Sequence, residues 1–151
     1  MADSTRSLLD RVPIFAGLKP EVLDDIHEHG RLVRMEPGDW IVREGTPGSE
    51  MFIVETGAVE VVIHPGLAHE TVVAVLRPGN FFGEMSLIEC MPRAASVRSL
   101  EAGILLGLKA GELHHLFRLW PDQYAILILN IARDLSRRLR ALDEKFSALS
   151  N

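Results

Sequence analysis

The residues best suited to chemistry lie in one segment, 81–97, which reads FFGEMSLIECMPRAASV. Gly83 allows the backbone to come close to a ligand, and the first N–H groups of a short helical turn at 85–89 would lack partners within the turn. The dipoles of these groups favour a negative charge beside them. Arg93 follows one short loop later and can fold back as a bidentate partner of a phosphate. The segment therefore predicts an anion-binding site.

Glu84 is out of place beside an anion, because like charges repel each other. The conflict disappears if Glu84 accepts a hydrogen bond from a sugar hydroxyl while Arg93 binds the phosphate. A ligand with a hydroxyl and a single charged phosphate on adjacent positions of one ribose is a 3′,5′-cyclic nucleotide. Taken singly, each of the two residues would be explained by a structural ion pair on a loop, and this alternative stays open at this point.

Catalysis and metal binding have weaker support. Ser86 could be a nucleophile, but no histidine or aspartate stands in a motif position to activate it. The six histidines form three close pairs in the sequence, none with convincing metal-ligand spacing. We therefore expect no catalytic residue and no metal site, and we expect these histidines to be solvated surface side chains: His27, His29, His64, His69, His114 and His115.

Length and composition indicate one ordinary globular domain. The chain has 151 residues, of which 47% are apolar and 25% charged, and its formal net charge is −5. A chain this acidic has no general attraction for nucleic acid phosphates. Its longest apolar stretches, 102–108 and 124–132, are too short to span a bilayer. The single cysteine, Cys90, excludes an internal disulfide and fits a cytoplasmic location.

Three zones follow one another along the chain. Residues 1–29 predict short N-terminal helices, with Pro20 starting the second of them. Residues 30–109 alternate strand-length runs with Pro-Gly turns, which favours a β-sandwich or jelly roll. The predicted strands are Arg31–Met35, Trp40–Val42, Met51–Glu55, Val59–His64, Glu70–Leu76, Ala94–Ser99 and Ile104–Leu108.

The last zone, 110–151, predicts C-terminal helices. A short helix at Gly111–Leu119 ends before Pro121, and a long one runs from about Asp122 to Leu149. Apolar residues recur along the long helix at alternating steps of three and four, which is typical of a helix that pairs with another helix. This seam consists of Ala125, Ile128, Ala132, Leu135, Leu139, Leu142, Phe146 and Leu149. It predicts a homodimer through the C-terminal helix.

The segment 81–97 resembles the phosphate-binding cassette of the cyclic nucleotide-binding domain family, which includes the catabolite activator protein and the regulatory subunits of cyclic AMP-dependent protein kinase. The family motif is matched from Phe82 to Leu87 and from Pro92 to Val97, and the upstream glycine pattern also fits. The similarity covers roughly residues 12 to 148. It implies a single domain over 1–151, mainly β with flanking helices. The expected core is an eight-stranded jelly-roll β-sandwich, with N-terminal helices before it and a long C-terminal helix after it.

The resemblance also implies residue roles. Glu84 would bind the ribose 2′-hydroxyl and Arg93 the cyclic phosphate, with no cofactor involved. The residues around them would complete the cradle or form an apolar wall around the base: Phe82, Gly83, Met85, Ser86, Ala94, Ala95, Val61 and Val73. Ala94 stands where a hydroxyl residue often accompanies selectivity for cyclic GMP, so alanine favours cyclic AMP. On the long helix, Leu142 and Asp143 lie near the place where some relatives have base-contacting hydroxyl residues.

These expectations describe a stand-alone sensor that passes nucleotide binding through its C-terminal helix to a dimer or an effector protein. Relatives that act as transcription factors carry a helix-turn-helix after this helix, whereas the sequence stops at Asn151, so direct DNA binding is not expected. The arginines of 133–140 are then expected to be solvated or to contact a partner. Two other classes remain open: a degenerate dimerisation module of the same fold, and a cupin-like metal-dependent enzyme. The chain could also be a fragment of a longer channel or regulator.

Overall fold

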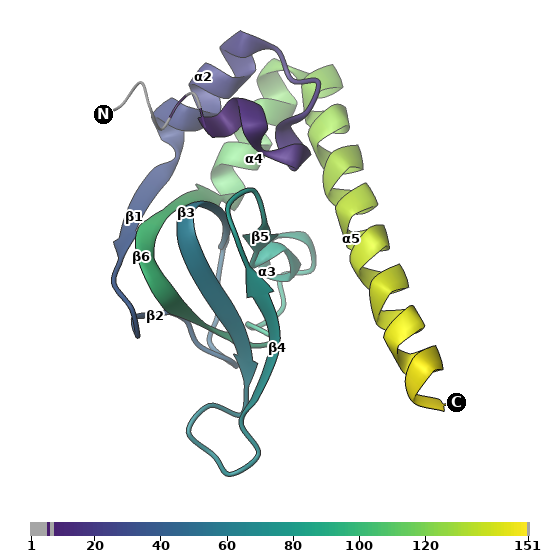
Figure 1. The fold of residues 1–151 in the computed structure, drawn as a ribbon. Helices are drawn as coiled ribbons and strands as arrows, with labels where there is room; N and C mark the ends of the chain where they lie inside the picture. Colours follow the sequence, from purple (N-terminus) through teal and green to yellow (C-terminus); the bar gives the residue numbers. More distant parts are fainter. Residues whose placement is uncertain (1–5, 7, 151) are drawn as a thin grey trace.

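The computed structural model describes residue 6 and residues 8–150; residues 1–5, 7 and 151 lie outside the described part. A β-sheet forms the centre, helices gather at one end of it, and a long helix runs down one side (Figure 1). The N-terminal zone contains two short 3₁₀ turns and one helix: η1 (Leu9–Arg11), η2 (Pro13–Phe15) and α2 (Pro20–His29). The expected helical start is therefore confirmed for the described residues.

The sheet is antiparallel throughout. Its strands are β1 (Arg31–Met35), β2 (Trp40–Val42), β3 (Glu50–Ile63), β4 (Thr71–Leu76), β5 (Phe81–Phe82) and β6 (Ser96–Lys109). The main path is β1-β6-β3-β4, with β2 added to β6 and β5 added to β3. The two long central strands, β3 and β6, pair along most of their length. The mainly β class with flanking helices is confirmed.

The structure has six strands in its described residues where eight were expected. The predicted strands on either side of Gly57 form one continuous strand, β3, and the predicted strands on either side of 100–103 form β6. Register shifts between Val54 and Val59 absorb the turn that the sequence indicates. Gly57 has a φ of +83°, and a Cβ there would lie 2.7 Å from the Ala102 carbonyl oxygen. Glycine thus bends the ladder without ending it.

Two apolar clusters hold the layers together. The first joins the helical end to the sheet, with Leu9, Ile26, Ile53 and Leu127 among its buried members. The second lies inside the sheet and is built around Phe52, Val54 and Leu105. Alternation along β3 explains the division, because Ile53 faces the helices while Phe52 and Val54 face the interior of the sheet.

The C-terminal zone consists of α4 (Ala110–Leu119) and α5 (Pro121–Ser150). The first half of α5 packs on the helical end through buried Leu127 and Ile131. Its Asn130 side chain donates hydrogen bonds to the carbonyl oxygens of Ile14 at 3.0 Å and Ala16 at 2.8 Å. None of the described helices is both long enough and apolar enough to cross a membrane.

The buried face of α5 differs from the seam that the sequence defines. Leu127 and Ile131 belong to the core, whereas Ala125, Ala132 and Leu139 of the seam are exposed. In the second half of the helix the seam continues in the open, and Leu139, Phe146 and Leu149 are 60%, 63% and 84% exposed. Leu135 of the seam is half-buried against the first apolar cluster, so only part of the seam packs on the domain itself. Pairing of the exposed part with a second helix stays a prediction.

Candidate functional site

One cavity of about 580 Å³ lies between the sheet, the short helix α3 (Glu84–Ile88) and the second half of α5. Each of the ten residues that the sequence predicts for the site lines this cavity: Phe82, Gly83, Glu84, Met85, Ser86, Arg93, Ala94, Ala95, Val61 and Val73. The structure therefore brings the contiguous cassette and the two strand residues to one place. Their roles toward a ligand stay predictions.

Gly83 sets the geometry of the cassette. It is the N-cap of α3 with a φ of 87°, a left-handed conformation that other residues rarely adopt. A Cβ at this position would lie 2.7 Å from Arg93 Nη1 and 3.0 Å from the carbonyl oxygen of Glu50. Both the turn and the close approach of Arg93 thus require glycine at this position.

Arg93 is a buried cation, with only 8% of its surface exposed. The adjacent loop holds its backbone, because the Arg93 N–H donates to the Thr46 carbonyl and the Gly45 N–H donates to the Arg93 carbonyl, both at 2.8 Å. The guanidinium donates one long hydrogen bond of 3.3 Å, from Nη1 to the Gly83 carbonyl oxygen. Burial lowers the pKa of Arg93 below its ordinary value, and Glu50 and Glu84 oppose that effect.

Glu84 and Arg93 line the same cavity, yet these two described residues form no ion pair within 4.0 Å. The alternative of a structural ion pair between them is therefore not what the structure shows. Arg93 is left without a carboxylate partner among the described residues, although burying a cation normally requires one. The site combines a buried guanidinium that forms no ion pair among the described residues with a half-buried carboxylate that lines the same cavity.

Aliphatic side chains from four strands, β2, β3, β4 and β6, form an apolar wall of the cavity. Val61 of β3 pairs in register with Ala74 of β4, beside Val73 at the cavity surface. Val73 is 50% exposed, so its side chain is free to contact a ligand. The wall has further members that the sequence did not predict: Val42, Ala74, Leu76 and Val97. Such a wall suits a flat apolar ring.

The second half of α5 forms the roof of the cavity. Four residues of this half line the cavity: Arg138, Ala141, Leu142 and Lys145. They follow one another at steps of three, one and three residues, which keeps them on one side of the helix. Arg138 Nη2 donates to the Phe81 carbonyl oxygen at 3.0 Å, and the guanidinium carbon lies 4.3 Å from the centre of the Phe81 ring. The structure thereby fixes α5 against the strand that leads into the cassette.

The sequence-based view of the arginines of 133–140 as solvated or partner-binding is wrong for Arg138. Besides its contacts with Phe81, Arg138 forms an ion pair with Asp134 at 2.8 Å. Of the two helix residues considered for the base, Leu142 lines the cavity and Asp143 is not among its lining residues. The spacing 138, 141, 145 was visible in the sequence, but the direction in which α5 leaves α4 was not.

Two of the six histidines that were expected to be solvated at the surface, His29 and His115, are 46% and 39% exposed but lie in a cluster. Spacing along the sequence pairs neither of them with the other, whereas in the fold His29 of α2 and His115 of α4 have ring centres 5.2 Å apart. Asp25 and Glu112 lie beside them. This cluster is far from the cavity and contributes nothing to its lining.

Comparison with known proteins agrees with this geometry. The sequence profile of the family described as "Cyclic nucleotide-binding domain" matches residues 32–119, which is more than half of the chain. The chain belongs to the cyclic nucleotide-binding domain family, a family of regulatory and sensor domains.

Three relatives illustrate the range of the family. The chain is 32% identical over 93 residues to a cAMP-dependent protein kinase regulatory subunit of Emericella nidulans, covering 62% of this chain and 22% of the relative. It is 34% identical over 139 residues to the cyclic AMP receptor protein of Thermus thermophilus, covering 91% of this chain and 62% of the relative. The crystal structure of the Thermus thermophilus catabolite activator protein matches with a TM-score of 0.76 at 34% identity, covering 91% of this chain and 63% of that one. The chain thus spans less than two thirds of each of them.

Proposed function

We propose that this protein is a regulatory domain that binds cyclic AMP in the cavity between the cassette and α5, and that it has no catalytic role of its own. The observation that carries the proposal is Arg93, a buried guanidinium at the cavity with a single 3.3 Å hydrogen bond and no carboxylate partner among the described residues. A phosphate in the cavity would supply the missing negative charge.

The remaining cassette residues fit the other parts of such a ligand. Glu84, half-buried at the first turn of α3, is the acceptor for the ribose 2′-hydroxyl. The backbone N–H groups of Met85 and Ser86 have no side-chain cap, because Gly83 provides none, and they are donors for the phosphate. Ala94 and Ala95 complete the cradle at the cavity surface.

The base is proposed to lie against Val61 and Val73 and beneath Leu142 of α5. These contacts are apolar, so they favour a purine ring without distinguishing adenine from guanine by hydrogen bonds. The preference for cyclic AMP comes from Ala94, which has no hydroxyl to offer a guanine amino group. Two of the similar proteins, the kinase regulatory subunit and the Thermus receptor, carry cyclic AMP in their names.

We further propose that the signal leaves through α5 in a homodimer or a complex with an effector protein, in the cytoplasm. Arg138, Ala141 and Lys145 face the cavity, while Leu139 on the same turn faces solvent at 60% exposure. A nucleotide that contacts the first set changes the position of the second, because both belong to one rigid helix. Differential affinity for the two helix positions is what drives such a change.

Calorimetric titration of the full chain with cyclic AMP, cyclic GMP and 2′-deoxy-cyclic AMP tests the proposal. Cyclic AMP is expected to bind most tightly. The 2′-deoxy ligand is expected to lose about 1.5–3 kcal/mol, the usual contribution of a hydrogen bond to a charged group. If cyclic AMP does not bind at high micromolar concentration, the function is refuted and the alternative of a degenerate dimerisation module gains support.

The variant Glu84→Ala separates the sugar contact from the rest of the site. It should weaken binding of cyclic AMP and leave binding of the 2′-deoxy ligand nearly unchanged, since that ligand lacks the hydroxyl that Glu84 accepts. Equal losses for both ligands would contradict the assigned role of Glu84. The exposed Glu101, on the far bend of β6 and outside the cavity lining, offers the matched control Glu101→Ala.

A further inference from the structure

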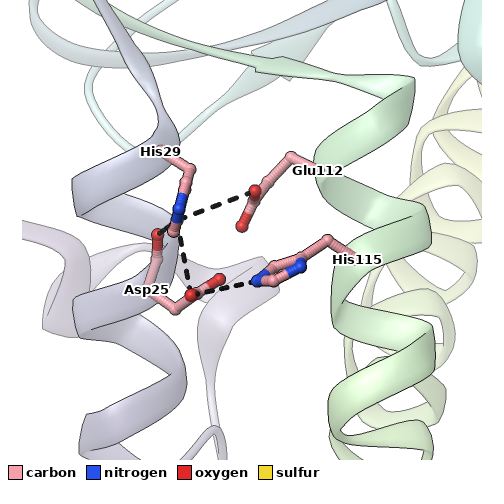
Figure 2. Close-up of side chains that lie close together, drawn as sticks. All are labelled: Asp25, His29, Glu112 and His115. Carbon is pink, nitrogen blue, oxygen red and sulfur yellow. Dashed lines mark hydrogen bonds and ion pairs between the residues drawn. The ribbon is translucent and has the colours of Figure 1, made fainter.

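The strongest feature outside the nucleotide site is the side-chain cluster between α2 and α4 (Figure 2). Asp25 and His29 are four residues apart on α2, and Glu112 and His115 are three residues apart on α4. Each pair therefore projects from one face of its helix toward the other helix. Figure 2 shows the four side chains converging from the two helices on one point.

The distances among the four side chains are those of a coordination sphere. His29 Nδ1 and His115 Nε2 each lie 3.3 Å from Asp25 Oδ1, and His29 Nδ1 lies 3.9 Å from Glu112 Oε2. One ligand atom from each residue lies within 4.8 Å of all the others. With zinc bonds of about 2.0–2.1 Å, ligands of a tetrahedral site are roughly 3.3 Å apart. Two of the observed distances already have this value.

The cluster also contains buried carboxylate oxygens that the described residues leave without a hydrogen-bond partner. The Glu112 side chain is 8% exposed, and its Oε1 atom is buried without a hydrogen-bond partner among the described residues. Asp25 Oδ2 is in the same situation. Two buried carboxylates side by side are unfavourable unless a cation lies between them.

The geometry points to a binding site for a transition-metal ion of the zinc class, held by Asp25, His29, Glu112 and His115. Two imidazole nitrogens and two carboxylate oxygens suit Zn²⁺ and Co²⁺, whereas Mg²⁺ and Ca²⁺ prefer oxygen ligands alone. His29 Nδ1 lies 3.0 Å from the Asp25 carbonyl oxygen, to which it donates when protonated. Metal binding at Nδ1 requires the neutral tautomer that carries its proton on Nε2, so the hydrogen bond from Nδ1 to the Asp25 carbonyl is given up.

The ion would join α2 to α4 and so strengthen the helical end of the domain. This site is separate from the cavity, and its existence does not depend on cyclic nucleotide binding. The effect is structural, since all four protein ligands close a tetrahedral sphere and leave no open position for a substrate.

Zinc binding to the chelator-stripped full chain tests the inference. Competition against a chromophoric chelator should give one tight site per chain, and Zn²⁺ at a hundredfold excess over its Kd should raise the Tm by roughly 5–10 °C. Mg²⁺ should not raise it. Co²⁺ should bind at the same site with the visible absorption of a four-coordinate ion. Absence of zinc binding, or an equal effect of Mg²⁺, would overturn the assignment.

Variants locate the site. Glu112→Gln keeps the size of the side chain and His115→Ala removes a ring that is 39% exposed, so the fold should survive at least one of them. Each should weaken zinc binding more than about 100-fold. Two variants serve as controls that should bind as the parent does: His114→Ala, at the exposed neighbour on α4, and His64→Ala/His69→Ala, at the other close histidine pair. Loss of binding in the second control alone would assign the metal to that pair and refute the site.

Discussion

Replacing Arg93 by glutamine should remove nucleotide binding without destabilising the ligand-free domain. In the ligand-free state the guanidinium makes a single 3.3 Å hydrogen bond, and burial lowers its pKa. The variant loses this hydrogen bond and the attraction of Glu50 and Glu84, but it also removes the larger cost of burying the charge. The ligand-free free energy of unfolding should therefore change by less than about 1 kcal/mol, or rise.

The nucleotide-bound state should respond in the opposite way. Truncating one partner of a buried, hydrogen-bonded charge pair costs about 2–5 kcal/mol, which corresponds to roughly a 30- to several-thousandfold increase in Kd. The Kd for cyclic AMP is measured by calorimetry, and the ligand-free Tm by calorimetric or spectroscopic melting. Arg34→Gln, at an exposed position of β1 outside the cavity lining, makes the same change in net charge and is the matched control.

The two measurements together decide the role of Arg93. A Tm that falls by more than about 10 °C in Arg93→Gln would show that the guanidinium stabilises the ligand-free fold. It would contradict the expectation that the buried charge costs the ligand-free domain stability. A Kd equal to that of Arg34→Gln would show that Arg93 does not contact the phosphate. Either result refutes the reasoning, and only the combination of lost binding with retained stability agrees with it.

Three further predictions follow from other residues. Gly48→Ala places a Cβ against the Arg93 guanidinium, so the flexible arginine side chain must move. The free energy of cyclic AMP binding should weaken by about 1–3 kcal/mol while the Tm of the ligand-free domain hardly changes. Titration and melting of one sample test this. Burial raises the pKa of Glu55 to about 7, from 4.5 in the unfolded chain. Between these pH values the folded state holds more protons than the unfolded state. The free energy of unfolding should therefore fall by about 3 kcal/mol as the pH rises through this range. Glu55→Gln should remove that fall, and parallel denaturation curves of the two proteins from pH 4.5 to 8 would contradict it. Leu139→Lys should dissociate the proposed dimer while Ser136→Lys, exposed one turn earlier and off the seam, should not; light scattering shows either outcome.

The cassette could be predicted from the sequence because its parts are contiguous. Gly83, Glu84 and Arg93 lie within eleven consecutive residues, and the need for a left-handed glycine before a helical turn is a local property. The family resemblance also pointed to Val61 and Val73, and both line the cavity, while their contact with a base stays a prediction.

Features that depend on distant contacts could not be predicted in this way. The predicted number of strands was too high because a glycine such as Gly57 indicates a turn in the sequence without showing whether strand pairing continues through it. In the structure Gly57 has a positive φ and the pairing of β3 with β6 continues on both sides of it. Arg138 and Lys145 face the cavity only because Asn130 and Leu127 fix the direction of α5 on the helical end. The cluster of His29 and His115 joins residues 86 positions apart, and no spacing within one helix reveals it.

The position of α5 connects the cavity, the exposed seam and the proposed metal site. Its first half is fixed to the helical end by Leu127, Ile131 and Asn130, whereas residues 141–149 are exposed apart from what they present to the cavity. Arg138 lies between the two halves and binds the Phe81 carbonyl at the entrance to the cassette. A phosphate that draws Arg93 and α3 toward itself therefore acts on the strand that Arg138 holds. In the proposed relay, the second half of α5 with its exposed apolar residues is the part that such a movement would displace furthest.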